Sequence, residues 1–284
     1  MISFLYSKIS IHPVFWLVIA AGMFTGHLWE TVIAFAIVLI HECGHAVAAY
    51  RMGWKVEAIE LLPFGGVAKI DESREHPFWQ ECIVVLAGPF QNVCLLFLGL
   101  LVAPGPFWGM QQQEIFYNQN MAILLFNLLP IWPLDGGRLL HLYLERLYPF
   151  KLAYKRTLLF SLMALLSLSV VMVLFYPLSV NLWVVISFIA LSIYKERQVI
   201  PLHFMRFLLA LSARAGPSPK IRHLFFEPDT SIVNVFSMFY KHTDHRIHVE
   251  GKKDMILDDR RLASAYFKGF RADGTLEDCS NTMG

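Results

Sequence analysis

The sequence predicts a polytopic α-helical membrane protein of about six transmembrane helices, with a membrane-associated β-hairpin and a small C-terminal cytoplasmic α/β domain. Two observations favour this class. First, 56% of the 284 residues are hydrophobic and only 16% are charged, whereas soluble domains carry roughly 25% charged residues. Second, the apolar residues collect in long uncharged runs rather than in amphipathic periods. A chain of this composition is expected to lie in a bilayer.

The charge and the cysteine content argue against other classes. The net charge is only +2, and Lys and Arg residues lie between apolar runs instead of forming one patch, so no direct nucleic-acid partner is expected. The cysteines are scattered along the chain, at Cys43, Cys82, Cys94 and Cys279. This spacing matches neither a disulfide framework nor a CxxC zinc knuckle, and we expect reduced thiols.

Six apolar runs are each near the length that a bilayer requires. They are residues Ile11–Leu28, Thr31–Tyr50, Glu81–Ala103, Ile115–Leu134, Thr157–Tyr176 and Leu178–Tyr194. The first run follows Lys8 and resembles a secretion signal, but a second apolar run follows it at once. We therefore expect a retained anchor.

Positive charge alternates from one connection to the next, which predicts the orientation because Lys and Arg stay preferentially on the cytoplasmic side. Positive residues precede the first run and follow the second, fourth and sixth: Lys8, Arg51, Lys55, Lys69, Arg74, Arg138, Arg146, Lys151, Lys155, Arg156, Lys195, Arg197 and Arg206. The connections His27–Glu30, Pro104–Glu114 and Tyr176–Asn181 contain no Lys or Arg. Both termini are therefore expected in the cytoplasm.

Residues 54–70 contain two short β-prone runs around Gly65-Gly66, which predicts a β-hairpin. The hairpin has an edge strand that could accept an extended peptide by β-addition, with Phe64, Gly65 and Gly66 as candidate substrate-binding residues. An amphipathic loop on the membrane surface is an equally good interpretation of the same residues.

The chain is expected to divide into a transmembrane domain at residues 1–197, a linker at 198–222 and a cytoplasmic domain at 223–284. Charges return after about Gln198, and Gly216-Pro217-Ser218-Pro219 is typical of a linker. The last region predicts a capped helix, a strand, a turn and a second helix. These lie from Thr230 or Ser231 to about Tyr240, at Ile247–Val249, at Glu250-Gly251 and at Leu262–Phe267.

The second apolar run contains His41-Glu42-Cys43-Gly44-His45, which is the HExxH pattern. Residues four apart share one helix face, so both imidazoles can bind one metal while Glu42 reaches a metal-bound water. A polar cluster that satisfies itself between helices is the alternative, but such residues are costly within an apolar span. Cys43 is expected to point away from the metal and to contribute to packing.

A catalytic zinc site takes three protein ligands, and Asp135 is the candidate for the third. It lies in the segment Asn127–Arg138, and Gly136-Gly137 allow backbone to approach closely there. By itself, a carboxylate at the end of a span is more typical of a capping or interfacial charge. With the HExxH pattern, it predicts peptide-bond hydrolysis by a zinc-activated water, with Glu42 as general base and acid.

Two features of the same segment concern the substrate. Pro130 and Pro133 should unwind the span beside the metal, because proline removes backbone donors. Asn127 could hydrogen-bond a substrate backbone or a developing oxyanion, or it could bind a neighbouring helix instead. Asn127 and Pro133 join the candidate substrate-binding residues.

The residues HECGH and NLLPIWPLDGGR, in this order, are similar to the two signatures of the site-2 protease family of intramembrane zinc metalloproteases. Ala87-Gly88-Pro89-Phe90-Gln91-Asn92 resembles a third element of that family. The layout of spans, LLPFGG hairpin and C-terminal domain resembles the sporulation branch from Bacillus-type spore formers.

That resemblance implies one Zn²⁺ per subunit and regulated intramembrane proteolysis during sporulation. It implies pro-sigma-K as the membrane-associated substrate, whose pro-sequence is removed, and inhibitory membrane proteins of the sporulation complex as partners. The implied location is the mother-cell membrane that surrounds the forespore.

The tail from Glu227 to about Phe267 resembles one cystathionine-β-synthase (CBS) motif. Such motifs usually work in pairs, which implies a homo-oligomer, and they often bind ATP or another adenine nucleotide. A small α/β domain that only docks the substrate or a partner is the alternative.

A non-proteolytic membrane zinc-binding protein or transporter is the rival function. It would need metal ligands but no base beside them, so the presence of Glu42 favours the enzyme.

Overall fold

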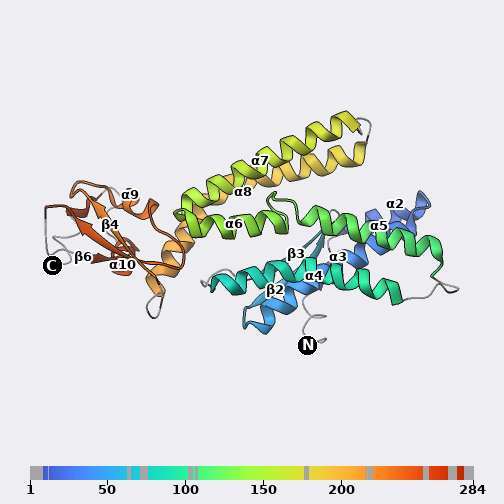
Figure 1. Cartoon of the computed structure of the whole chain (residues 1–284), viewed down its shortest axis with the longest axis horizontal. Helices are drawn as coiled ribbons and strands as arrows, with labels where there is room; N and C mark the ends of the chain where they lie inside the picture. Colours follow the sequence, from blue (N-terminus) through green and yellow to red (C-terminus); the bar gives the residue numbers. More distant parts are fainter. Residues whose placement is uncertain are drawn as a thin grey trace. The chain divides into compact units, whose positions relative to one another are not determined.

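A computed structural model of the chain is drawn in Figure 1. It describes residues 9–11, 13–62, 65–70, 76–101, 105, 108–175, 179–214, 216, 220–251, 256–267 and 274–277. The chain divides into two compact units. The first unit comprises Met1–Glu72, Phe78–Leu139 and Ala164–Ile189, and the second comprises Ser73–Pro77, Leu140–Met163 and Ala190–Gly284.

The elements follow one another in two groups. Helices with one hairpin come first: β1 (Ile9–Ile11), α2 (Pro13–Phe24), α3 (Leu28–Arg51), β2 (Val56–Leu62), β3 (Gly65–Ile70), α4 (Phe78–Leu101), α5 (Met110–Asn127), α6 (Asp135–Leu147), α7 (Phe150–Phe175) and α8 (Val180–Ala213). A small α/β module follows: β4 (Ile221–Phe226), α9 (Ile232–Ser237), β5 (Asp244–Val249), β6 (Ile256–Asp258) and α10 (Asp259–Phe267).

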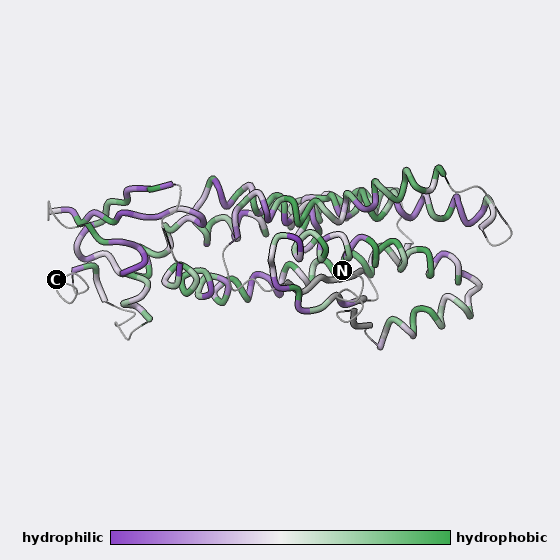
Figure 2. The backbone as a smooth tube through the Cα atoms, turned by 90° about the horizontal axis from the view of Figure 1, so that it is seen from below, coloured by the Kyte–Doolittle hydropathy of each residue, from purple (hydrophilic) through white to green (hydrophobic). Residues whose placement is uncertain are grey.

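Among the described residues, α3, α4 and α7 are long and apolar enough to cross a bilayer. Much of α7 is exposed apolar surface, including Leu166, Leu174 and Phe175, and such a surface is stable in lipid rather than in water. Figure 2 shows the long helices largely in the hydrophobic colour. The three helices correspond to three predicted spans, and the prediction of six spans stays a prediction.

Helix α3 is the centre of the first unit, where it contacts α2, α4, α5, β2 and β3. Its buried residues recur every three or four positions, as a helix with one packed face requires: Ile33, Ile37, His41, Gly44, His45, Ala46 and Ala49. Gly44 lets α4 approach, because a Cβ there would lie 2.7 Å from the carbonyl oxygen of Ala87. Cys43 packs against the small apolar cluster around Ala46 and Val84, as predicted.

The predicted hairpin is present, and a third strand extends its sheet. Strand β2 pairs antiparallel with β3 and parallel with β1, so the strand order is β1-β2-β3. Gly65 and Gly66 are paired strand residues opposite Leu62 and Leu61, and not the turn that the sequence suggested. Glycine permits many backbone conformations, so its presence marks a turn only weakly. Phe64 lies outside the described residues.

The fourth predicted span does not continue to Leu134. Helix α5 ends at Asn127, an irregular connection covers residues 128–134, and a new helix begins at Asp135. Pro130 and Pro133 both lie in this connection, as expected for residues that cannot donate a helical hydrogen bond.

The predicted linker at residues 198–222 is partly helical, because α8 continues through Pro201 to Ala213. The apolar side chains Phe204, Phe207, Leu208 and Leu211 of this extension are buried. Their burial favours continuing the helix beyond the residue at which charge returns, and hydrophobicity alone could not show this.

The C-terminal module contains the capped helix, the strand, the turn and the second helix that the sequence predicts, although α9 ends at Ser237, and it also contains strands β4 and β6. Ser231 caps α9 by accepting a hydrogen bond from the backbone N–H of Asn234 at 3.4 Å. Strand β5 lies between β4, which is parallel to it, and β6, which is antiparallel. In the interior, Asp259 accepts hydrogen bonds from the backbone N–H and the Nδ1 atom of His245 at 2.7 and 2.8 Å. This buried pair fixes α10 to the sheet.

A buried carboxylate holds α6 within the second unit. The Glu145 Oε2 atom lies 3.1 Å from Lys241 Nζ, and Glu145 Oε1 lies 3.2 Å from His141 Nε2. Burial opposes ionisation of Glu145, but Lys241 and His141 outweigh it and lower the pKa of the carboxyl to about 2. Because the ordinary value is 4.5, the stabilisation is fully present above that pH and is lost as the pH falls towards 2.

We therefore predict that acid weakens the second unit through Glu145. Between about pH 6 and pH 3, the melting temperature of the wild-type chain in detergent should fall more steeply than that of Glu145→Gln, since glutamine cannot titrate. The titration represents at most about 3 kcal/mol. Scanning calorimetry measures both slopes. Equal slopes would contradict the assignment, and Asp229→Asn, at an exposed carboxylate of the same unit, serves as the control.

Candidate metal centre

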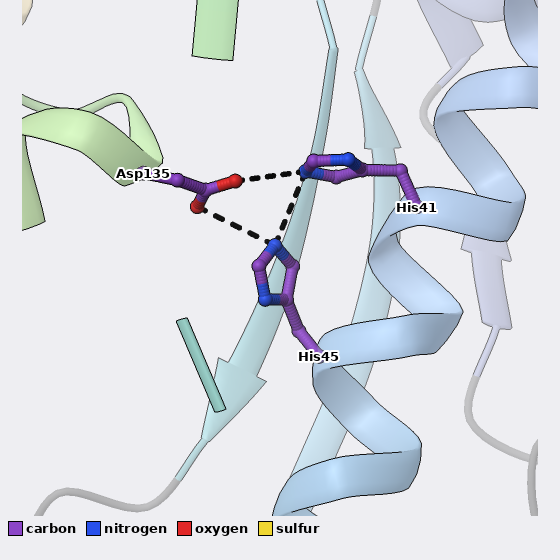
Figure 3. A group of neighbouring side chains, drawn as sticks. All are labelled: His41, His45 and Asp135. Carbon is purple, nitrogen blue, oxygen red and sulfur yellow. Dashed lines mark hydrogen bonds and ion pairs between the residues drawn. The ribbon is translucent and has the colours of Figure 1, made fainter. Parts of the chain in front are cut away.

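Three buried side chains converge within the first unit, as Figure 3 shows. His41 and His45 come from α3, and Asp135 is the first residue of α6. His41 Nε2 lies 3.0 Å from Asp135 Oδ2, and His45 Nε2 lies 3.4 Å from Asp135 Oδ1. The two Nε2 atoms are 3.2 Å apart. The three side chains that the sequence suggested as ligands are thus brought together, and each is at most 7% exposed.

Local structure explains these positions. His41 and His45 are four residues apart on a helix, so their rings lie one turn apart on the same face. Asp135 begins a helix, where the partial positive charge of the unpaired N–H groups favours a carboxylate. Gly136 and Gly137 pack α6 against the preceding connection, because a Cβ on Gly136 would lie 2.2 Å from the carbonyl oxygen of Leu128. Larger residues there would displace Asp135.

Helix α4 orients both imidazoles from the other side. The Nδ1 atom of His41 lies 2.8 Å from Asn92 Oδ1, and the Nδ1 atom of His45 lies 2.8 Å from the carbonyl oxygen of Val84. A carbonyl oxygen can only accept a hydrogen bond, so each Nδ1 carries the hydrogen and donates it to α4. In the neutral imidazoles, each Nε2 therefore presents a lone pair to the centre.

The groups that face the centre are therefore hydrogen-bond acceptors, and none of them is a donor. Two Nε2 lone pairs face a carboxylate, and Asp135 Oδ2 receives no hydrogen bond from the described residues. Buried acceptors at 3.0 to 3.4 Å repel one another unless a cation lies between them. Two imidazoles and one carboxylate whose ligand atoms lie within 4.8 Å of one another form a donor set suited to Zn²⁺. The residues present therefore fit a zinc ion.

Gly88 of α4 leaves the space that an ion would need. A Cβ at this position would lie 2.2 Å from His45 Nε2 and 2.7 Å from His41 Nε2. Both distances are too short for any side chain to coexist with these rings. Glycine at this position keeps the Nε2 atoms accessible.

The other predicted site residues lie as follows. Glu42 is half-buried on α3 between the two histidines. Asn127 is the last residue of α5 and its Nδ2 donates to the carbonyl oxygen of Ile123, within its own helix, at 3.1 Å. Pro133 is half-buried in the connection before Asp135. Gly65 and Gly66 lie on β3, and Phe64 lies outside the described residues.

Sequence reasoning gave no role to three residues that surround the centre. Gly88 and Asn92 were noted only as part of a motif, and Asn120 of α5 was not considered. Asn120 is fully buried and its Nδ2 donates to the carbonyl oxygen of Asn92 at 2.9 Å. The sequence did offer one signal for Asn120, because an amide side chain within an apolar run is expected to have a hydrogen-bond partner.

Comparisons with known proteins agree with this geometry. Residues 30–109 and 107–172 match the model of peptidase family M50. The chain is 35% identical over 275 residues to stage IV sporulation protein FB from Bacillus subtilis, and the match covers 95% of each chain. It is 28% identical over 218 residues to a zinc metalloprotease from Methanocaldococcus jannaschii, covering 74% of this chain and 60% of that protein.

A solved structure is also similar. The site-2 protease from Methanocaldococcus jannaschii superposes with a TM-score of 0.50 and 28% sequence identity, covering 66% of this chain and 89% of that one. The family match includes His41, His45 and Asp135. The chain therefore belongs to peptidase family M50, the site-2 proteases, and is an intramembrane zinc metalloprotease.

Proposed function

We propose that His41, His45 and Asp135 hold the zinc ion and that Glu42 is the general base and acid of peptide-bond hydrolysis. The observation that carries this proposal is the convergence of three acceptor groups whose repulsion a cation would relieve, together with the contacts of α4 that orient the two imidazoles.

Each residue of the site then has a separate role in the reaction. When bound, Zn²⁺ supplies a Lewis acid that polarises the scissile carbonyl and makes a water molecule acidic near neutral pH. Glu42, next to His41 in sequence, accepts the proton of the attacking water and delivers it to the leaving amine. Asn92 and the Val84 carbonyl keep the imidazoles in the tautomer that binds metal. Asn127, at the end of α5, and Pro133, in the connection before Asp135, are proposed to contact the substrate.

The hairpin is proposed to hold the substrate. A helical substrate shields its peptide bonds in its own hydrogen bonds, so cleavage needs an extended segment. Among the described strands, β3 is at the edge of its sheet, opposite β1 in the order β1-β2-β3. Helix α3, which carries both histidines, contacts β3. A peptide added beside β3, next to Gly65 and Gly66 and the adjoining Phe64, would therefore lie near the proposed metal centre.

We further propose the biological setting. The similarity to stage IV sporulation protein FB supports pro-sigma-K as the substrate, inhibitory membrane proteins as partners and the mother-cell membrane around the forespore as the location. The alternation of Lys and Arg supports six spans with both termini in the cytoplasm. The C-terminal module is proposed to pair with a second subunit as CBS motifs do, and to bind ATP or another adenine nucleotide.

Gly88→Ala is predicted to weaken zinc binding while all three proposed ligands remain. The added methyl group would occupy the space in front of both Nε2 atoms, so affinity should fall by at least about tenfold, as when other residues that support metal ligands are changed. Zinc per purified subunit, measured by mass spectrometry, checks this. The matched control is Gly99→Ala on the same helix, where the added Cβ meets only the side chains of Phe116 and Tyr117. A zinc affinity of Gly88→Ala equal to that of the wild type, measured by competition with a chelator, would refute the proposed site.

Glu42→Gln is predicted to stop cleavage and to leave zinc in place. Glutamine keeps the shape of the side chain but cannot accept the proton, and loss of a general base costs about 10²- to 10⁴-fold in rate. Coexpression with pro-sigma-K, followed by the size of the substrate, measures the effect. If the variant processed the substrate at the wild-type rate, Glu42 would not be the base. If the zinc-loaded wild type left pro-sigma-K uncut, the substrate assignment would need revision.

Proline substitutions on β3 are predicted to impair cleavage without loss of zinc. Adjacent N–H groups of an edge strand point to opposite sides, so Val67→Pro and Ala68→Pro remove one donor facing β2 and one facing the open edge. The variant that loses the outward donor should keep the hairpin and its zinc but process substrate more slowly. Undiminished cleavage by both variants would exclude strand addition at β3.

A further inference from the structure

Two consecutive residues of α5 donate hydrogen bonds from their amide side chains to backbone carbonyl groups of two other helices. Gln119 Nε2 donates to the carbonyl oxygen of Glu30 on α3, at 2.9 Å. Asn120 Nδ2 donates to the carbonyl oxygen of Asn92 on α4, also at 2.9 Å. All four residues belong to the first unit, in which α5 contacts both α3 and α4. The two amides therefore join α5 to the helix that carries the proposed histidine ligands and to the helix that orients them.

Asn120 is connected to His41 through one intervening residue, Asn92. Asn92 accepts a hydrogen bond from Asn120 at its backbone carbonyl oxygen, and another at Oδ1 from His41 Nδ1, at 2.8 Å. Asn92 and Asn120 are both fully buried. Hydrogen bonds at such positions are stronger than the same bonds in water. The contact between α5 and α4 thus bears directly on the residue that orients His41.

The orientation of the Asn92 amide decides which nitrogen of His41 carries the hydrogen. In the structure Oδ1 faces Nδ1, so Nδ1 donates, and Nε2 keeps a lone pair that faces the centre. If the amide turned by half a rotation, its Nδ2 group would donate to Nδ1 instead. The hydrogen of the neutral imidazole would then lie on Nε2, and a metal could not bind that nitrogen. The placement of Asn92 therefore matters for metal binding.

Packing alone does not explain an amide at position 120. The Asn120 Oδ1 atom is buried and has no hydrogen-bond partner among the residues that the structure describes. A buried acceptor without a partner is unfavourable, and an apolar side chain of similar size, such as leucine, would avoid this cost. What the amide supplies, and leucine could not, is the hydrogen bond to the carbonyl oxygen of Asn92.

We propose that Asn120 is a positioning residue of the metal centre. It holds the backbone of Asn92 and thereby keeps the Oδ1 atom of that residue within hydrogen-bond reach of His41 Nδ1. Asn120 touches neither the metal nor the substrate, and it acts through Asn92. The inference rests on the proposed function, because it concerns how firmly His41 is held as a ligand. It adds α5, which carries none of the three proposed ligands, to the helices on which zinc affinity depends.

The first test measures the zinc affinity of the full-length chain, purified in detergent, by competition with a chromogenic chelator. Asn120→Leu should lower the affinity by a factor between about twofold and thirtyfold, the range for changes along a coupled network. The matched control is Gln119→Leu, which breaks the same kind of bond from the neighbouring residue. Its acceptor, on Glu30, lies about 16 Å from His41 along the axis of α3. The affinity of this control should equal that of the wild type.

The second test asks whether Asn120 acts through Asn92. Asn92→Ala removes the acceptor of the His41 hydrogen bond and should lower zinc affinity by about 10- to 100-fold. When Asn120→Leu is added to Asn92→Ala, the affinity should not fall further, because no side chain is left to position. A residue that only stabilised the fold would lower the affinity by the same factor in both backgrounds.

The outcomes separate this inference from the proposed function. A wild-type chain that binds no zinc would overturn the metal centre itself. If zinc-loaded wild type and Asn120→Leu have equal affinities, only the role of Asn120 is overturned. An equal loss in Asn120→Leu and Gln119→Leu, or an equal loss from Asn120→Leu with and without Asn92→Ala, would also overturn that role. Wild-type affinity in Asn92→Ala would do the same, since Asn120 would then have no route to His41.

A second variant keeps the inference testable if Asn120→Leu does not fold. In Asn120→Ser the hydroxyl can bond to a carbonyl group of its own helix, and the shorter side chain loses the bond to Asn92. The same loss of zinc affinity is expected, and an affinity equal to that of the wild type would contradict the inference.

Discussion

Mutual repulsion among three acceptor groups is the constraint around which the rest of the first unit is arranged. Two imidazole nitrogens and a carboxylate meet at buried positions within a helical core. Such a group of acceptors is stable only if two requirements are met. The hydrogen bonds of the side chains must be made elsewhere, and the acceptors must share a cation. Helix α4 meets the first requirement by taking both Nδ1 hydrogens. The second requirement is met because two imidazole nitrogens and a carboxylate are suitable ligands for one cation.

Close backbone approach is the means by which the core accommodates this centre. Gly44 brings α3 against α4, Gly88 keeps the ring nitrogens accessible, and Gly136 with Gly137 brings α6 against the connection before it. At each of these positions even a methyl group would meet backbone or ring atoms at less than 3 Å. The geometry of the centre therefore depends on these glycines, which have no side chain, as much as on the three proposed ligands.

The sequence predicted the three residues that converge at the proposed metal centre because their chemistry is unusual in an apolar run. Two histidines one turn apart and an aspartate beside two glycines needed no structure to be noticed. The apolar runs likewise predicted α3, α4 and α7, since length and hydropathy suffice for such helices. The prolines correctly marked the unwound connection before Asp135.

What the sequence could not predict depends on contacts between distant residues. The role of Asn92 requires His41, 51 residues away, to lie beside it. The role of Gly88 is visible only when both rings face it. The extension of α8 to Ala213 depends on burial of Phe204, Phe207 and Leu211, which no local pattern reveals. The contact of Lys241 with Glu145 joins residues 96 positions apart, and no local pattern indicates it.

The two edge strands of the sheet in the first unit differ in length, and this difference favours addition of a further strand at one edge. Within the described part of the chain, strand β1 has three residues, whereas β3 has six. Since every second residue of a border strand turns its N–H and C=O outward, β3 exposes about three such residues and β1 about one or two. A polypeptide joining this sheet would gain more backbone hydrogen bonds at β3 than at β1. Strand length alone thus gives the sheet a preferred direction of extension, with no selectivity required from any side chain.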